Sequence, residues 1–188
     1  MRLELKNVKH FAELSRDGNA FSATLYASGK RICKVSNDGN GGCDMHEPLQ
    51  KEKLSLMRKR LQPVLDYIAT LPPHVSDAYK NDDGSPLTYD QDIDSVVSEL
   101  FTDTMIMRDA RRNLNRYVMG FDTKSKQLYT WSLTHRGETV LASKVNAAAL
   151  SDHMGKIGMK NPDVILLNQL PESEIIGYVK QAHAANFT

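Results

Sequence analysis

The chain has 188 residues, of which 40% are hydrophobic and 25% charged, and its formal net charge is +1. These fractions are typical of globular proteins and exclude an intrinsically disordered chain. A net charge this small excludes a strong overall field that would attract nucleic acid or an anionic membrane. The length favours a single domain that covers residues 1–188.

The cysteines and the hydropathy of the sequence indicate a cellular compartment. Two cysteines, Cys33 and Cys43, are too few for the disulfide framework of a small secreted module. The first residues, MRLELKNVKHF, lack the apolar run of a signal peptide, and no stretch is long and apolar enough to span a bilayer. We therefore expect a soluble cytoplasmic protein that does not bind membranes.

Three extended segments open the chain. Residues 3–10 form the first, and the turn-rich SRDGN at 15–19 separates it from the second. In AFSATLYAS the apolar side chains alternate with polar ones, which is typical of a strand with one buried face. The SGK turn at 28–30 leads into RICKVS. The pattern predicts a three-stranded antiparallel meander.

Two helices and a long loop are expected next. Apolar residues recur every three or four positions over residues 54–68, and Pro63 inside this helix predicts a kink or a break near Arg60. Residues 72–89 are rich in Asp, Asn, Gly and Pro, which predicts a long loop that is either functional or mobile. Thr88 and Gln91 have capping-box spacing and predict a second helix that ends near Arg116.

The last third of the chain alternates strands and helices. YVMGF and QLYTWSL flank DTKSK as a hairpin, with Trp131 as a core anchor. NAAALSDHMGKIG is expected to be a helix, PDVILLNQL a buried strand, and PESEIIGYVKQAHAA a closing helix with Pro171 in its first turn. The predicted fold class is α+β, with an antiparallel or mixed sheet built from the meander, the later hairpin and a strand, and with helices on one face.

The segment VSNDGNGGCDMHEP at 35–48 allows three interpretations. Gly39, Gly41 and Gly42 suit a phosphate cradle, but the sequence matches neither the dinucleotide nor the P-loop pattern. Cys33, Cys43 and His46 suit a metal site, but only one pair has ligand spacing. A Cys43 nucleophile with His46 as its base is a variant of the enzymatic reading. We favour the third interpretation, in which the glycines permit positive φ where the chain leaves the sheet, and we assign no catalytic residue, metal or cofactor.

Charge is segregated along the sequence. Eight acidic residues lie between Ser76 and Asp103, whereas basic residues cluster on the two predicted helices. Solvated helical faces are the simpler explanation of this pattern. The same residues can also form a patch that binds an acidic protein or phosphates. The candidate partner-binding residues are Arg58, Lys59, Arg60, Arg108, Arg111, Arg112 and Arg116.

Two motifs resemble a group of small bacteriophage and prophage proteins of unassigned activity. In that group a strand hairpin leads into a VSN-x-G-x-GG loop, and an LN-x-LP-x-x-E segment lies near the end. Here the corresponding residues read ASGK, VSNDGNGG and LNQLPESE, about a quarter of the chain. The resemblance implies a cytoplasmic accessory protein of an infected bacterium and carries over no catalytic residues.

The function that we predict is non-enzymatic binding of a host protein, such as a defence component, whose activity the protein modulates or inhibits. The first alternative is a nucleic-acid-binding regulator that uses the arginines at 108, 112 and 116 on backbone phosphates. The second alternative is a small enzyme, or a nucleotide-binding or metal-binding protein, built on the glycine loop.

Overall fold

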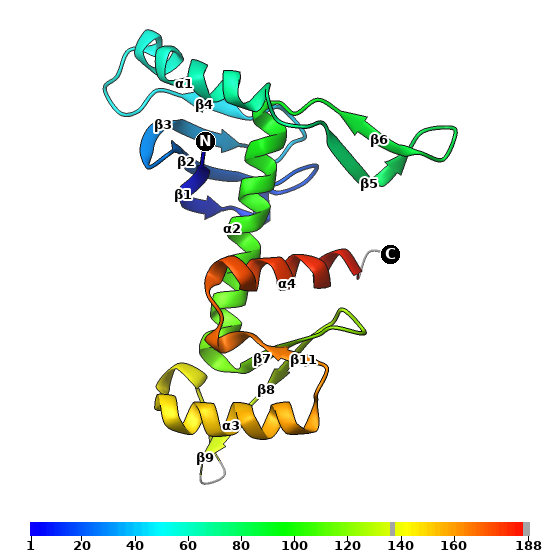
Figure 1. The fold of residues 1–188 in the computed structure, drawn as a ribbon. Helices are drawn as coiled ribbons and strands as arrows, with labels where there is room; N and C mark the ends of the chain where they lie inside the picture. Colours follow the sequence, from blue (N-terminus) through cyan, green and yellow to red (C-terminus); the bar gives the residue numbers. More distant parts are fainter. Residues whose placement is uncertain (136–137, 186–188) are drawn as a thin grey trace. The chain divides into compact units, whose positions relative to one another are not determined.

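The computed structural model describes residues 1–135 and 138–185 (Figure 1). It confirms the α+β class, with four α-helices and eleven strands among the described residues. Contacts group the chain into two compact units, unit 1 (residues 1–104) and unit 2 (residues 105–188), and the boundary falls within helix α2 (Ile93–Arg116). The single domain over 1–188 stays a prediction, and each unit is described by itself below.

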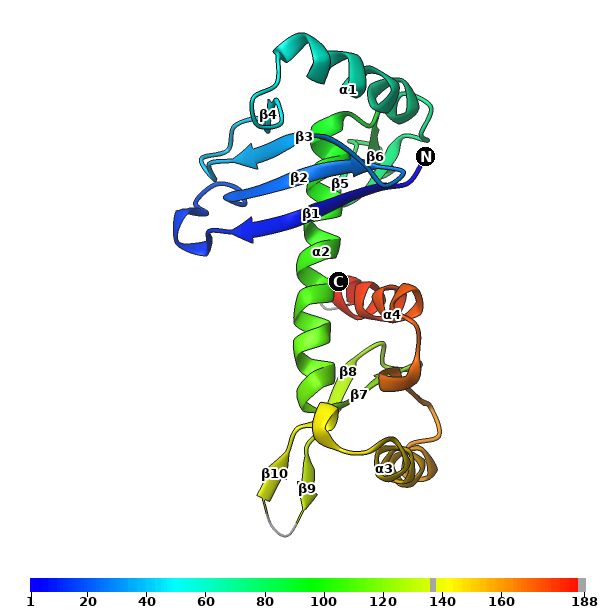
Figure 2. The ribbon, with the colours of Figure 1, turned by 90° about the vertical axis from the view of Figure 1, so that its left-hand side faces the viewer.

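Unit 1 is built on a four-stranded antiparallel sheet, in which β1 (Leu3–His10), β2 (Phe21–Ala27), β3 (Lys30–Asn37) and β4 (Met45–Glu47) lie in chain order (Figure 2). The predicted meander is confirmed as its first three strands. The alternating side chains of β2 bury the four apolar residues Phe21, Ala23, Leu25 and Ala27.

The turn between β2 and β3 and the bulge that follows it shape one end of this sheet. Ser28 and Gly29 both have positive φ, 47° and 80°, as a type I′ hairpin turn requires. In the register of the two strands Leu25 faces Cys33 and Tyr26 faces Arg31, so Ile32 between them has no partner on β2. This bulge leaves the backbone carbonyl of Ile32 outside the hydrogen-bond ladder with β2.

The glycine segment was expected to lead the chain out of the sheet. Instead, it leads the chain back into the sheet. Strand β4 pairs with residues 34–36 of β3 in an antiparallel register. Residues 38–44 are therefore the connection of a hairpin. The three residues of β4 are too few for alternation to be visible in the sequence.

Helix α1 (Leu54–Ile68) contains Pro63 and is continuous, so a break near Arg60 is wrong, whereas the kink expected as its alternative stays a prediction. Proline removes one amide donor, which leaves the carbonyl of Lys59 without its helical bond. Lys59 and Pro63 are both exposed, so water can hydrate that carbonyl. The opposite face of α1 buries Met57, Val64 and Ile68 in the core of unit 1.

The prediction of a long loop at residues 72–89 is wrong. Strands β5 (His74–Lys80) and β6 (Pro86–Tyr89) form an antiparallel hairpin there. The Asp, Asn and Gly residues that suggested a loop make its turn. The amide of Asn81 donates to the carbonyl of Ser85 at 2.8 Å, and Gly84 has a φ of 83°.

The start of α2 differs from the prediction, whereas its end at Arg116 is as expected. Thr88 belongs to β6 and cannot cap the helix. Asp92 and Ser95 cap it instead. The Ser95 amide donates to Asp92 Oδ1 at 2.7 Å, and the Asp92 amide donates to Ser95 Oγ at 2.9 Å. The first half of α2 belongs to unit 1, where Phe101 lies against Phe21 with ring centroids 4.6 Å apart.

Unit 2 contains the predicted hairpin and helices. Its elements are β7 (Val118–Asp122), β8 (Leu128–Trp131), β9 (Leu133–His135), β10 (Glu138–Val140), α3 (Ala147–Lys160), β11 (Val164–Leu166) and α4 (Glu172–Ala185). The order of the three-stranded sheet is β11, β7, β8, and β9 pairs with β10. The strand expected in PDVILLNQL has only three residues, because a 3-10 turn begins at Leu167. Pro171 precedes α4, and its carbonyl accepts from the amides of Glu174 and Ile175 in the first turn.

The core of unit 2 joins the second half of α2 to β7 and α4. Met107, Phe121, Leu167 and Val179 are among its buried members. Trp131, expected as a core anchor, is partly buried and packs beside a second cluster. Its ring passes over Gly120, where an added Cβ would lie 2.9 Å from Trp131 Cζ3.

Asn168 closes the C-terminal end of α2. Its Nδ2 donates to the carbonyls of Leu114 at 3.2 Å and Tyr117 at 2.9 Å, and its Oδ1 accepts from the Met119 amide at 2.7 Å. One side chain thereby satisfies backbone groups that the helix end leaves open. The LN pair of the LNQLPESE motif therefore has a structural explanation.

Candidate functional site

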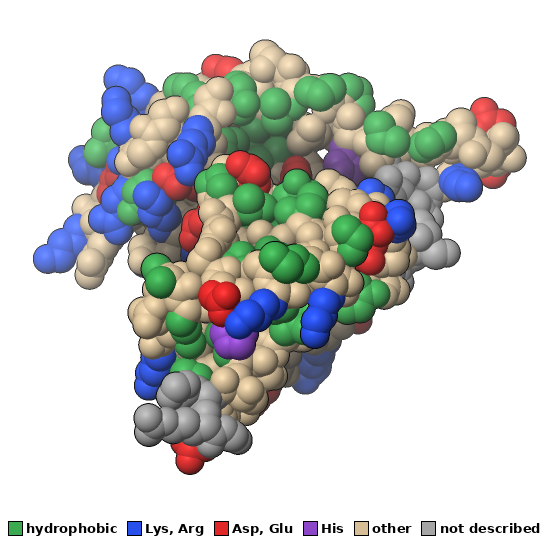
Figure 3. Space-filling view, turned by 60° about the horizontal axis from the view of Figure 1, so that its bottom comes forward, with side chains coloured by type: hydrophobic (Ala, Val, Ile, Leu, Met, Phe, Trp, Pro, Cys, Tyr) green, Lys and Arg blue, Asp and Glu red, His purple; other side chains and the backbone are tan. Residues whose placement is uncertain are grey.

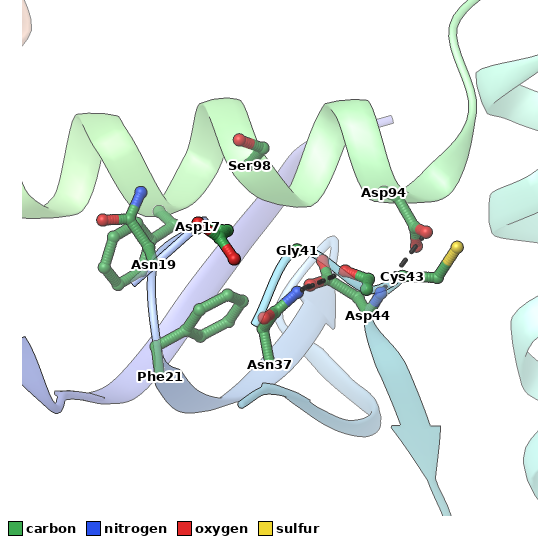
Figure 4. Close-up of a pocket in the computed structure, with 12 residues that line it drawn as sticks. Asp17, Asn19, Phe21, Asn37, Gly41, Cys43, Asp44, Asp94 and Ser98 are labelled. Atoms are coloured by element: carbon green, nitrogen blue, oxygen red, sulfur yellow. Dashed lines mark hydrogen bonds between the residues drawn. The ribbon is translucent and has the colours of Figure 1, made fainter. Parts of the chain in front are cut away.

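The glycine loop is organised by the side chain of Asn37 (Figure 4). Its Oδ1 accepts from the Gly39 amide at 2.8 Å, and its Nδ2 donates to the Gly42 carbonyl at 3.0 Å and to Asp44 Oδ1 at 2.9 Å. These bonds lie within the loop itself. The polar groups that hold the loop are therefore already satisfied by the chain.

Positive φ is needed at two of the three predicted glycines. Gly39 and Gly41 have φ values of 82° and 81°, whereas Gly42 does not have positive φ. A Cβ on Gly39 would also lie 2.5 Å from the carbonyl oxygen of Leu14, closer than real side chains approach. The predicted conformational role is confirmed for these two glycines, within a hairpin connection rather than at an exit from the sheet.

A cavity of about 300 Å³ lies beside this loop, between it and the start of α2. Three carboxylates line it, those of Asp17, Asp44 and Asp94, and its lining contains no Lys or Arg from the part of the chain that the structure describes. Burial, followed by the charges of Asp94 and Asp92, raises the pKa of Asp44, while the hydrogen bond from Asn37 opposes the shift. This lining repels a phosphate group, so the electrostatics disfavour the phosphate cradle.

The two cysteines and His46 lie in different settings. Cys33 is fully buried, and burial raises the pKa of its thiol to about 11, so it packs as a small apolar residue, as expected. Cys43 is exposed, and Figure 4 shows its sulfur directed away from Asp17 and Phe21. His46 lies on β4, and its Nε2 is buried without a hydrogen-bond partner. Within residues 1–135 and 138–185, no three His, Cys, Asp or Glu side chains are grouped to hold a metal ion.

A second cavity of unit 1 has the opposite chemistry. It has a volume of about 570 Å³ and lies between α1 and the end of the sheet that carries the β2–β3 turn. We call it the α1 groove. Its apolar floor comes mainly from Ala27, Ile32, Leu56 and Val64. Its other lining residues are Met1, Ser28, Lys30, Glu52, Lys59, Arg60 and Pro63.

Arg60 fixes one wall of the α1 groove. Its Nε and Nη2 donate to the carbonyl of Ile32 at 3.2 and 2.8 Å, which satisfies the acceptor that the bulge in β3 left open. The same guanidinium binds both carboxylate oxygens of Glu52, with Nη2 donating to Oε2 at 2.6 Å. The Arg60 guanidinium holds the pKa of Glu52 below its ordinary value. Arg60 is therefore committed to the fold, and its role in partner binding stays a prediction.

The rim of the α1 groove carries cations for which the described residues provide no carboxylate partner. Lys30 and Lys59 line it and make no ion pair within the described chain, and Arg58 beside them is exposed. Leu54 and Leu56 expose 46% and 53% of their surface on the same helix. Figure 3 shows Lys and Arg side chains gathered on the side of unit 1 that carries the β2–β3 turn. Apolar surface and unpaired positive charge thus lie together.

The predicted arginines of α2 lie in unit 2. Arg111 binds Glu172 through two bonds, Nε to Oε1 at 2.7 Å and Nη2 to Oε2 at 2.6 Å, and the pair lowers the pKa of Glu172. Arg112 forms an ion pair with Asp109, in which Nη2 lies 3.4 Å from Oδ1. The structure gives no ion pair for Arg108 or Arg116 in the part of the chain that it describes. The predicted basic residues therefore fall into two sets, residues 58–60 in unit 1 and residues 108–116 in unit 2.

Sequence reasoning identified Arg58 and Lys59 but missed the groove beside them. Lys30, Ile32 and Leu56 were not predicted as site residues. The sequence signal was a leucine at position 56, which falls outside the three-four spacing that Met57 follows. Ile32 gave none, because its place depends on a bulge that forms only in the folded sheet.

Comparisons with protein-family models, with curated proteins and with solved structures gave no match. Among the described residues, no helix has both the length and the hydropathy needed to cross a membrane.

Proposed function

We propose that the protein is a non-enzymatic, phage-type accessory protein that binds a host protein in the bacterial cytoplasm and modulates its activity. The observation that carries the proposal is the α1 groove, an apolar cavity whose rim lysines make no ion pair with any described residue. The resemblance of VSNDGNGG and LNQLPESE to small phage proteins supports the phage and host context.

The chemistry of the groove indicates what kind of segment it binds. The floor takes an aliphatic side chain, because every apolar residue that lines it is aliphatic or Met. Lys30 and Lys59 favour carboxylates on either side of that anchor. We therefore expect the partner to present an exposed segment with a Leu, Ile or Met flanked by Asp or Glu.

The apolar floor and the lysines at the rim of the groove should contribute different amounts of binding free energy. Complete burial of a Leu-sized anchor contributes about 1.5–3 kcal/mol. A solvent-exposed ion pair contributes only about 0.2–1 kcal/mol. The floor therefore supplies most of the affinity, and the lysines select acidic segments over basic ones.

The same geometry ranks the two alternatives. Single-stranded nucleic acid binds by stacking its bases on aromatic side chains, and no aromatic residue lines the α1 groove. A nucleic-acid regulator therefore depends on Arg108 and Arg116. Binding that falls steeply with salt and is lost on replacement of both arginines by glutamine would favour it. For the enzyme, the glycine loop offers a cavity lined by three carboxylates and by the exposed Cys43, whose sulfur is directed away from Asp17 and Phe21.

A peptide-display selection on the full-length protein tests the proposal. Random peptides are selected for binding to the wild-type chain, and the affinities of the enriched peptides are measured by fluorescence anisotropy. We expect enriched sequences that combine one aliphatic residue with two or more acidic residues. Leu56→Asp and Lys59→Glu should each weaken binding about tenfold or more.

Lys144→Glu is the matched control, because it makes the same charge change at an exposed residue of unit 2 that does not line the groove. It should leave the affinity unchanged. Enrichment of basic peptides, or peptides that bind Leu56→Asp as tightly as the wild type, would refute the proposed site.

A further inference from the structure

The outer face of the unit 1 sheet, opposite the buried side chains of β2, holds a third cavity of about 280 Å³. The strand register places Lys6, Thr24, Lys34 and Glu47 in one row across the four strands. Ser22 and Ser36 face each other in the next row. Residues that share a row lie on the same face of the sheet. The polar groups that line the cavity come from Asn7, Ser22, Thr24, Lys34, Ser36 and Glu47.

Thr24 is the most deeply buried polar residue that lines this cavity. It is only 7% exposed, and it is the one buried polar residue of the core among those described. Its hydroxyl has no hydrogen-bond partner in the described chain. Thr24 lines the cavity, so a ligand that enters it can reach this hydroxyl and bond to it.

Other lining groups are also free to bind a ligand. Within the described residues, Ser22 and Ser36 make no side-chain hydrogen bond, and Lys34 makes no ion pair. Asn7 has a φ of 55° at the irregularity between Lys6 and Lys9 on β1. A bulge of this kind redirects a side chain, and here Asn7 lines the cavity rather than continuing the regular alternation.

The balance of donors identifies the class of ligand. Three hydroxyls, one amide and one ammonium donate, whereas Glu47 is the single group that only accepts. Three further cations, Lys6, Lys9 and Arg31, lie opposite β2 residues of the same face. Lys6 is paired with Glu4, but Lys9 and Arg31 make no ion pair in the described structure. We propose that this cavity binds an oxyanion, the phosphate group of a small ligand, through Thr24, Ser22, Ser36 and Lys34.

Glu47 distinguishes between classes of ligand, because its negative charge should lower the affinity for a phosphate and raise the affinity for a sugar or an amino acid. It lies opposite Lys34 and competes with an anion for the ammonium. Removing its charge should therefore tighten the binding of phosphate. For a sugar or an amino acid, Glu47 would instead accept a hydrogen bond from a hydroxyl or an ammonium, and its removal would weaken binding.

The test is an NMR titration of the full-length protein with inorganic phosphate, glycerol phosphate and glycerol at constant ionic strength. We expect saturable shifts at the amides of Ser22, Thr24 and Ser36 with both phosphates and none with glycerol. Saturation with inorganic phosphate alone would assign the site to the free ion, and tighter binding of glycerol phosphate would assign it to a phosphorylated ligand. Both results support an oxyanion site.

Three variants complete the test. Thr24→Val keeps the β-branched shape and should weaken phosphate binding about fivefold, Lys34→Met should weaken it about tenfold, and Glu47→Gln should tighten it about threefold. An unchanged pattern of amide shifts away from the site shows that each variant is folded. Absence of saturable shifts in the wild type, equal binding by Thr24→Val, or weaker binding by Glu47→Gln would overturn the proposal.

Discussion

The glycine-loop cavity and the α1 groove lie in the same unit and have opposite chemistry. The first is lined by three carboxylates, and the loop beside it is held by hydrogen bonds of Asn37 within the chain. The second is apolar, and its lysines have no partner in the described chain. The most conspicuous motif of the sequence thus serves the fold, whereas an ordinary amphipathic helix borders the surface that is left incomplete.

Gly39 should give the largest effect if the glycine loop is structural. Gly39→Ala places a Cβ against the Leu14 carbonyl and forces positive φ on a residue with a side chain, so we expect a loss of about 2–4 kcal/mol in the stability of unit 1. Gly42→Ala, with open space and no positive φ, should change it by less than about 0.5 kcal/mol. Hydrogen exchange of the β2 and β3 amides measures both. Equal effects at the two glycines would contradict the structural role.

Asn37 tests the same side of the comparison through hydrogen bonds. Asn37→Ala removes three of them, and we expect a loss of about 2 kcal/mol in stability together with faster amide exchange over residues 38–44. Asn19→Ala, at an exposed residue that lines the same cavity, is the control and should change stability by less than about 0.5 kcal/mol. A loop that keeps its protection without Asn37 would show that the backbone alone specifies it.

Arg60 and Lys59 are neighbours on α1 with different roles, because Arg60 holds a wall of the α1 groove and Lys59 lies at its rim. Arg60→Met leaves the Ile32 carbonyl without its donors, and we expect a loss of about 1–2 kcal/mol in stability. Lys59→Met should change stability by less than about 0.5 kcal/mol and still weaken peptide binding. Denaturant unfolding followed by the exchange of β3 amides measures the difference. A stability loss in Lys59→Met as large as that in Arg60→Met would remove the distinction.

The smallest expected effect is on the pH dependence of stability, which should differ between Asp44 at the glycine-loop cavity and Glu52 at the α1 groove. The folded-state pKa of Asp44 is raised above 3.8, so its charged form weakens folding above that raised pKa, and the penalty is relieved as pH falls through it. Asp44→Asn should therefore stabilise unit 1 at pH 7 by about a few tenths of a kcal/mol, because solvent screens this half-exposed group, and by nothing at pH 3.

Glu52 has the opposite sign. Arg60 depresses its folded-state pKa below 4.5, so its contribution is present above 4.5 and is lost as pH falls through the depressed pKa. Glu52→Gln should destabilise unit 1 at neutral pH and lose that effect in acid. Stability curves of the two variants that change in the same direction would contradict these assignments.

Local patterns predicted much of the fold. The alternation in β2 and the three-four spacing of α1 reflect which faces are buried, and both elements lie where those patterns placed them. The predicted start of α2 was wrong because the sequence offers both Thr88 and Asp92 as acceptable N-cap residues. Pairing of β6 with β5 decides between them. The hairpin at residues 74–89 was missed because turn residues dominate its composition.

The candidate sites depend on contacts between distant segments, which a single sequence does not display. The α1 groove needs the bulge at Ile32 and the bonds from Arg60, 28 positions away. The cavity on the outer face needs Thr24 to lie between strands that supply Lys34 and Asn7. The motif residues Asn37 and Asn168 are visible in the sequence, and the hydrogen bonds in the structure explain both as supports of the fold.

One measurement tests the central claim most directly, namely NMR mapping of where a selected acidic peptide binds on the full-length protein. We predict that the amide shifts concentrate at Ile32, Leu56 and Lys59 and that residues 38–44 keep their positions. Shifts centred on the glycine loop, with the α1 groove unaffected, would contradict the account.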